Sequence, residues 1–182
     1  MKNVFEEGLI KFISVLEDES IGYVIIGALA SGIYSLPRAT YDIDVLIEIE
    51  KIKIPKFLES LKKSGFSFDK DHLLKELTQG YLSEVYYKDV RIDIILPVLP
   101  YFREVIRRAR CFSLYDKEIR FATCEDVIIL KLLSDREYDR KDIAGIKEIQ
   151  TTIDTDYIKK NIERLIGKET LSYQRFQEFF GS

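Results

Sequence analysis

The stretch YDIDVLI, residues 41–47, decides the fold of this chain, because it sets two acids into an otherwise apolar strand. Runs of Val, Ile and Leu this dense are typical of strands buried in a sheet. Side chains alternate between the faces of a strand, so Asp42 and Asp44 share one face and the apolar residues take the other. Burying a carboxylate without a partner is costly, and a divalent cation is the simplest compensation. Mg2+ commonly binds one or two protein carboxylates together with substrate phosphates.

A third acid stands in a second apolar stretch, VRIDIIL at residues 90–96, where Asp93 shares a face with Arg91 and Ile95. If this strand lies beside the first one in register, three carboxylates converge. Three acids on two rigid strands can hold two Mg2+ ions about 4 Å apart, an arrangement that serves in-line displacement at phosphorus. The structural alternative is that Asp42 caps the end of a strand and Asp93 forms an ion pair with Arg91.

The spacing of apolar residues and of turn residues predicts alternating helices and strands along the chain. Strands are expected at residues 23–26, 41–49, 81–87 and 90–96, with a small hairpin at 111–121. Helices are expected at about 4–18, 28–35, 55–64, 70–79, 101–110, 123–134, 139–150, 155–166 and 169–180. The predicted fold class is therefore α+β. A mixed β-sheet core flanked by helices, residues 1–98, is followed by a mostly helical region, residues 99–182, packed on that core.

A tight turn at Gly27-Ala28 joins the strand at 23–26 to the short helix that follows it. Free backbone amides at the start of a helix bind anions, and glycine permits close approach of the backbone. Such a turn could hold the β and γ phosphates of a nucleotide opposite the carboxylates. A turn of this kind can equally serve packing alone.

The composition excludes several classes of site. The chain has one histidine, His72, and two cysteines, Cys111 and Cys124, so it offers neither a zinc knuckle nor Ser-His-Asp catalysis. A net charge of −3 argues against a general nucleic-acid coat protein. The N-terminus turns acidic at once, and no apolar run approaches the ~20 residues that span a bilayer. We therefore expect a cytoplasmic protein without a membrane partner.

Taken together, these motifs resemble a known family. Ile26-Gly27-Ala28, then Asp42-Ile43-Asp44, then Asp93 on a later strand is similar to the nucleotidyltransferase superfamily of DNA polymerase β type. The stretch at residues 27–44 resembles small prokaryotic members, which include the minimal nucleotidyltransferases and the nucleotidyltransferase toxins of abortive-infection systems. Residues 122–142 resemble the helical segment that such proteins carry, so the resemblance spans roughly residues 20–150.

The resemblance implies a role for each acid and for the glycine turn. Asp42 and Asp44 would bind Mg2+, and Asp93 would complete the metal site and act as the base on the acceptor hydroxyl. The amides of Gly27 and Ala28 would hold the triphosphate. Many active members carry Gly-Ser or Gly-Gly at this turn. Here Ala28 offers only its amide, with Ser31 one helical turn away.

Two basic residues are further candidates for the triphosphate. Arg38 stands close enough to the first acidic strand to reach phosphates, or it is a surface arginine near Glu48 or Asp42. Lys131 is the single charge in VIILKLL, residues 127–133, and either reaches outward to solvent or points at a buried anion. The resemblance favours a triphosphate contact for Lys131. Asp142 is a weaker candidate, because its surroundings would also suit a solvated helix face.

The function implied by the resemblance is Mg2+-dependent transfer of NMP from an NTP to an acceptor hydroxyl on RNA, on a protein or on a small molecule. Two Mg2+ ions are expected. The nearest-looking relatives suggest a toxin–antitoxin or phage-defence system, with an antitoxin as protein partner. An alternative is a degenerate, non-catalytic module of the same fold that binds a nucleotide or a partner, which Ala28 favours. A glycosyltransferase ranks last, because only 41 residues precede the acidic motif.

Overall fold

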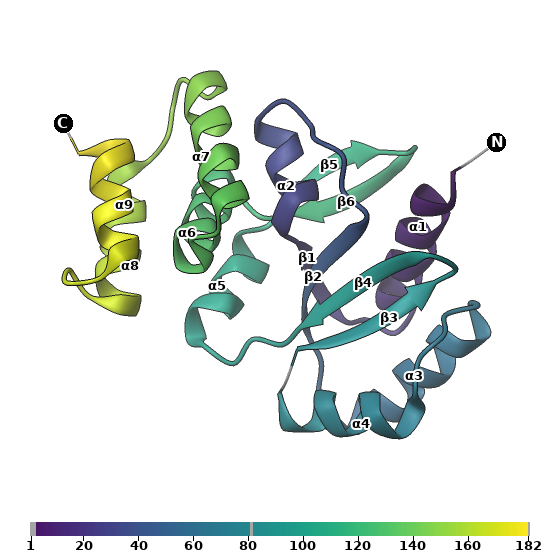
Figure 1. Ribbon diagram of the computed structural model, residues 1–182. Coiled ribbons are helices and arrows are strands. Elements are labelled where there is room, and N and C mark those ends of the chain that lie inside the picture. The colour runs from purple at the N-terminus through teal and green to yellow at the C-terminus, as the bar shows by residue number, and fades with distance from the viewer. Residues whose placement is uncertain (1–2, 81, 182) are drawn as a thin grey trace. The chain divides into compact units, whose positions relative to one another are not determined.

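The computed structural model describes residues 3–80 and 82–181. Its elements are shown in Figure 1 and follow one another in this order: α1 (Val4–Asp18), β1 (Gly22–Ile25), α2 (Gly27–Tyr34), β2 (Asp42–Glu48), the 3-10 turn η1 (Lys51–Lys53), α3 (Ile54–Lys63), α4 (Lys70–Gln79), β3 (Ser83–Tyr87), β4 (Val90–Ile95), α5 (Pro100–Arg108), β5 (Arg110–Leu114), β6 (Lys117–Phe121), α6 (Cys124–Ser134), α7 (Glu137–Ile149), α8 (Thr155–Ile166) and α9 (Leu171–Phe180).

The strands form one mixed sheet of six strands in the order β3-β4-β2-β1-β6-β5. β2 runs parallel to β4 and antiparallel to β1, whereas β1 runs parallel to β6. The two outer pairs are antiparallel hairpins. The second hairpin turns at Tyr115 and Asp116, which both have positive φ, as the two-residue turns that match strand twist require. The predicted α+β class is confirmed.

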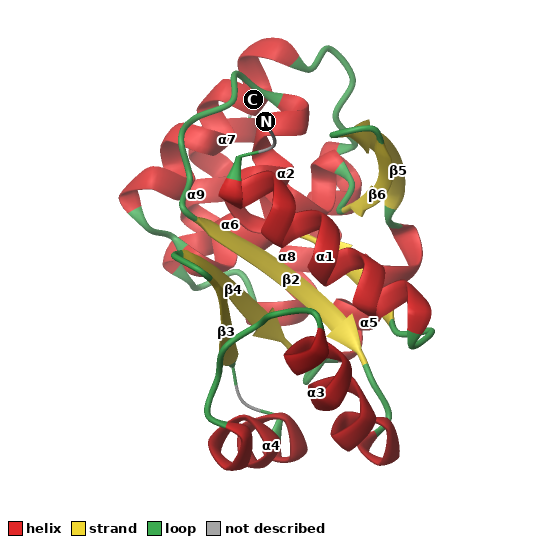
Figure 2. Cartoon of the chain, turned by 90° about the vertical axis from the view of Figure 1, so that its right-hand side faces the viewer, coloured by secondary structure: helices red, strands yellow, loops and turns green. Residues whose placement is uncertain are grey.

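One face of the sheet is covered by the first helix. Leu9, Phe12 and Leu16 recur at helical spacing and are fully buried. α1 packs against β1, β4 and α3, and Figure 2 shows it running alongside β2. The apolar positions of β2 and β4, such as Ile43 and Ile92, are also fully buried. Alternation along the strands therefore leaves the acidic positions on the opposite face.

The chain divides into two compact units that do not follow the predicted boundary. Unit 1 comprises residues 1–26 and 39–122, and unit 2 comprises residues 27–38 and 123–182. We placed the change from core to helical region at residue 98. In the structure the sheet continues past that point, because β5 and β6 complete it, and α2 groups with the later helices α6 and α7. Within unit 2, the Gln150 side chain donates to the Tyr34 carbonyl at 2.8 Å.

Most predicted elements are confirmed, with ends shifted by a few residues. Thr123 is the N-cap of α6, since its hydroxyl accepts a hydrogen bond from the Asp126 amide. Helix α5, expected at residues 101–110, ends at Arg108, because Arg110 begins β5. The turn η1 was not anticipated, and Tyr81, predicted to start a strand, lies outside the described residues. None of the described helices combines the length and the apolar character needed to cross a bilayer.

Candidate active site

The three predicted acids lie side by side in unit 1. In the parallel ladder between β2 and β4, Asp44 is paired with Asp93, and Asp42 is paired with Arg91. Partners in register stand on the same face of neighbouring strands, about 4.8 Å apart. All four side chains are partly buried, between fully buried apolar neighbours of the opposite face. The sequence pattern thus brings Asp42, Asp44 and Asp93 onto one surface of the sheet.

Arg91 lies between two of these carboxylates. Its Nη2 is 2.7 Å from Asp42 Oδ2, and its Nε is 3.1 Å from Asp93 Oδ1. The second contact is electrostatic, because the buried Nε makes no well-angled hydrogen bond. The ion pair that we weighed as the structural alternative for Asp93 is therefore present. The same guanidinium also binds Asp42, which we did not foresee although the register of the two strands places it there.

The environment of Asp93 favours its protonated form. Burial is the largest influence, and the carboxylates of Asp44, Asp42 and Glu84 act in the same direction against the opposing effect of Arg91. Together they raise the pKa of Asp93 to about 6. A carboxyl group that changes its protonation near neutral pH can accept a proton in catalysis.

The raised pKa of Asp93 makes the stability of the folded protein depend on pH. The folded-state pKa of Asp93 is about 6 against an ordinary value of 3.8, so the folded state holds this proton more tightly than the unfolded chain does. The stabilising effect of that proton is complete below about pH 4 and is lost as the pH rises through about 6. We therefore expect Asp93→Asn to raise the free energy of unfolding near neutral pH by on the order of 1 kcal/mol. This value is reduced from the full pKa shift, because solvent screens the charge and because the ion pair with Arg91 is lost.

Urea unfolding in EDTA at about pH 7.5 and at about pH 4 measures this effect. Asp93→Asn should raise the free energy of unfolding at the higher pH and leave it unchanged at the lower pH. Asp89→Asn, at an exposed position in the turn of the same hairpin, is the matched control. An equal gain at both pH values would contradict a raised pKa for Asp93.

The donor chemistry of the three acids suits Mg2+, which prefers carboxylate oxygens. Among the residues that the structure describes, however, no three acidic, histidine or cysteine side chains stand in the arrangement of a finished metal site. The Arg91 guanidinium holds Asp42 and Asp93 instead. Because the Arg91 side chain is 39% exposed, rotation toward solvent would release both carboxylates for a metal.

The glycine turn follows the sheet directly in the chain. The Ile26 amide donates to the Asp44 carbonyl at 3.0 Å, and Gly27 is the next residue. Gly27 has a φ of 65°, a left-handed conformation that glycine adopts without strain, and it begins α2 in unit 2. The predicted phosphate contact of Ser31 stays a prediction. Ser31 is buried, and its hydroxyl donates to the Gly27 carbonyl within the same helix.

Arg38 and Lys131 meet in unit 2, where they share Asp142. Arg38 Nε is 3.0 Å from Asp142 Oδ1, and Lys131 Nζ is 2.5 Å from Asp142 Oδ2. Lys131 is 4% exposed and also binds Asp139, at 3.1 Å. Lys131 therefore points at buried anions, which was one of our two alternatives. These anions are carboxylates of the protein itself. Asp142, the partner of Arg38, is buried rather than on a solvated face.

The side chains of Arg38, Lys131, Arg136, Asp139 and Asp142 form an ion-pair cluster in unit 2. Burial alone would raise the pKa of Asp139, but attraction and hydrogen bonding to Lys131 and Arg136 outweigh burial and lower it. The hydrogen bond to Asp142 raises the pKa of Arg38. Asp139 and Arg38 are therefore both charged at neutral pH. Sequence reasoning missed Asp139, although its i,i+3 spacing to Asp142 on a predicted helix puts both acids on one face.

A pocket of about 320 Å³ opens beside Asp93 in unit 1. Helix α4 contributes His72 and Glu76 to its lining, and strand β3 contributes Glu84 and Tyr86. Glu84 is in register with Asp93 across the antiparallel ladder, which places it on the same face as the acids. The His72 side chain is 68% exposed at the pocket. Glu84 was not among the predicted site residues, although its position in the predicted hairpin could have identified it.

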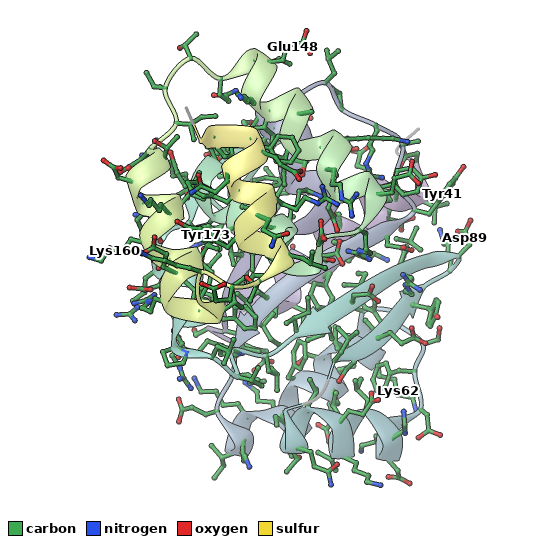
Figure 3. All side chains as sticks on the ribbon, turned by 60° about the vertical axis from the view of Figure 1, so that its left-hand side comes forward. Tyr41, Lys62, Asp89, Glu148, Lys160 and Tyr173 are labelled. Atoms are coloured by element: carbon green, nitrogen blue, oxygen red, sulfur yellow. The ribbon has the colours of Figure 1, made fainter. Side chains whose placement is uncertain are left out.

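The acids stand near one edge of this surface. Figure 3 labels Tyr41, which precedes β2, and Asp89, which precedes β4, and both lie where the two parallel strands begin. Asp42 is the first residue of β2, so its side chain is 44% exposed, whereas Asp93 lies deeper along β4 and is 16% exposed. The acidic surface is therefore more exposed to solvent at Asp42 than at Asp93.

The sheet carries two acids on β2 and a third on its parallel neighbour β4, which is the arrangement that the resemblance to nucleotidyltransferases implied. Residues 5–175 match the model of a protein family described as "Nucleotidyl transferase of unknown function (DUF2204)". The chain belongs to this family, which confirms the resemblance to nucleotidyltransferases. The closer likeness to abortive-infection toxins stays a prediction.

Solved structures show the same fold. The lincomycin-bound lincosamide antibiotic adenylyltransferase LnuA is 15% identical, with a TM-score of 0.54, over 82% of this chain and 100% of that one. A candidate nucleotidyltransferase from Thermotoga maritima, TM1012, is 14% identical, with a TM-score of 0.50, over 75% of this chain and 88% of that one. No curated protein matches the sequence.

Proposed function

We propose that this protein is a Mg2+-dependent nucleotidyltransferase that transfers NMP from an NTP to an acceptor hydroxyl. The observation that carries this proposal is the register of β2 and β4, which sets Asp44 beside Asp93 with Asp42 on the same face. Membership of a nucleotidyl transferase family supports the same reaction.

Each residue of the surface has a task in this reaction. Asp42 and Asp44 would hold Mg2+, which when bound neutralises charge on the phosphates. Asp93, with its pKa raised to about 6, would accept the proton of the acceptor hydroxyl near neutral pH. Arg91 must first leave Asp42 and Asp93. Once displaced, its guanidinium would remain beside the phosphates as a positive charge.

The triphosphate would bind at the amides of Gly27 and Ala28. The left-handed Gly27 begins a helix, and a helix N-terminus favours anions. Its chain neighbour Ile26 is hydrogen-bonded to Asp44, so the backbone leaves the sheet at the level of the second acid. Arg38 and Lys131 would contact the triphosphate only if they exchanged Asp142 for phosphate oxygens.

The similar structure LnuA is that of an antibiotic adenylyltransferase with lincomycin bound, which makes a small molecule the first acceptor class to test. RNA and protein acceptors, and a toxin–antitoxin setting with an antitoxin partner, remain predictions from the sequence alone.

The assay incubates the protein with Mg2+ and each of four α-labelled NTPs, and supplies RNA, protein and small-molecule fractions of a cell extract as acceptors. We expect label in one fraction, released pyrophosphate, and loss of both in EDTA. Label that appears equally without divalent metal would contradict the proposed chemistry.

A binding module without turnover is the second candidate. It is favoured by the Arg91 guanidinium, which holds two of the three acids, and by Ala28, which offers only an amide to a phosphate. NTP binding by calorimetry together with absence of label in every fraction would support this candidate over the transferase.

A further inference from the structure

The pocket beside Asp93 has the size and position of a substrate site. Its volume of about 320 Å³ suits a small molecule rather than a polymer. Asp93 is itself part of the lining, so a hydroxyl of a bound molecule can reach the group that we assign as the base. Phe68 and Tyr86 add aromatic surface to the lining.

The charge of the lining is one-sided. Four of its described residues are acids, Asp69, Glu76, Glu84 and Asp93, and none is lysine or arginine. Asp69 accepts a hydrogen bond from the His72 amide, and Glu84 accepts one from the Tyr86 hydroxyl at 3.0 Å. Both of these donors are neutral. Glu76 pairs with the exposed His72 ring, which carries charge only when protonated. Among the described residues that line the pocket, these carboxylates therefore have no lysine or arginine beside them.

We infer that this pocket binds the acceptor, and that the acceptor is a cationic, hydroxyl-bearing small molecule. Its amine would lie near Glu76 and Glu84, and its hydroxyl near Asp93. This inference rests on the proposed function, because it assigns the acceptor of that same reaction. Opposite charges attract strongly in a partly enclosed site, and an ammonium group also binds well over an aromatic ring such as that of Tyr86.

The same charges disfavour the other acceptors. RNA presents one phosphate per nucleotide, and its binding relies on lysine and arginine. A pocket with four acids would repel such a backbone, and it would likewise repel the triphosphate of the NTP. The pocket therefore separates the acceptor from the nucleotide by charge.

The test uses three probes with one sugar ring and different charges: glucosamine, glucose and glucose 6-phosphate. Binding is measured by NMR titration of the whole protein without nucleotide. We expect glucosamine to bind with the lowest Kd, to weaken with added salt, and to weaken roughly fivefold in Glu84→Gln and about 20-fold in the Glu76→Gln, Glu84→Gln double variant. Glu59→Gln, an exposed acid on α3, is the control and should leave the Kd unchanged.

Transfer of label to each probe, and to a short RNA hairpin, is then measured with Mg2+ and NTP. Binding of glucosamine that depends on Glu84 supports the inference even if no label is transferred, and that result counts against the proposed reaction alone. Equal binding of the three probes, or binding that Glu84→Gln leaves unchanged, would overturn the inference. Efficient labelling of the RNA hairpin in both wild-type protein and the double variant would also overturn it, while it would leave the nucleotidyltransferase proposal intact.

Discussion

Asp44→Asn is expected to lower kcat/KM for NMP transfer by at least about 100-fold, because it removes the charge of the residue paired directly with Asp93. Neutral asparagine is a much poorer Mg2+ ligand than a carboxylate, so the metal would bind weakly and the phosphate charge would remain. The fold should survive, since the change removes repulsion among neighbouring acids. The rate is measured by pyrophosphate release at saturating and at limiting Mg2+.

Asp89→Asn is the matched control for this experiment, because it makes the same chemical change at an exposed turn of unit 1. It should change the rate by less than about twofold. Titration of Mn2+ by electron paramagnetic resonance provides a second readout and should show weaker binding in Asp44→Asn only. Full activity of Asp44→Asn would show that the acidic surface of the sheet is not the catalytic centre.

Lys131→Met is expected to lower the free energy of unfolding by about 3 kcal/mol, because it removes a buried cation and leaves its carboxylate partners behind. Asp139 and Asp142 both bind Lys131 and are both nearly buried. Asp139 keeps its ion pair with Arg136, and Asp142 keeps its ion pair with Arg38. The expected loss is therefore at the lower end of the range for a broken buried ion pair. Urea unfolding followed by circular dichroism measures the change.

Lys141→Met provides the control on the neighbouring helix. Lys141 is 65% exposed in an i,i+4 pair with Glu137, and pairs of this kind contribute little to stability. Its replacement should change the free energy of unfolding by less than about 0.5 kcal/mol. If Lys131→Met proved as mild as Lys141→Met, the ion-pair cluster would not be a stabilising element of unit 2.

The sheet and its acidic face could be predicted from the sequence because both depend on local patterns. Alternation along residues 41–47 and 90–96 fixes which side chains share a face, and turn residues fix where the strands end. Helix α6 could be placed from its cap, because Thr123 and the acids after it favour a helix start.

Other features depend on contacts between distant segments, which local patterns do not encode. The pairing of β1 with β6 across nearly a hundred residues was not predictable, and neither was the grouping of α2 with the later helices. The sequence left two alternatives for Lys131, because a single lysine in an apolar run can either be buried against an anion or extend its charged end into solvent. The partners that decided the outcome lie on the next helix.

Unit 2 is built from two distant segments of the chain, and this affects how the protein folds as it leaves the ribosome. Residues 27–38 are made early, but their partners begin only at residue 123. An isolated helix as short as the eight residues of α2 is unstable in water, so this segment must wait until most of the polypeptide has emerged. A nascent chain halted near residue 122 would carry that segment without its partners, so holdase chaperones should recognise it at this stage of translation.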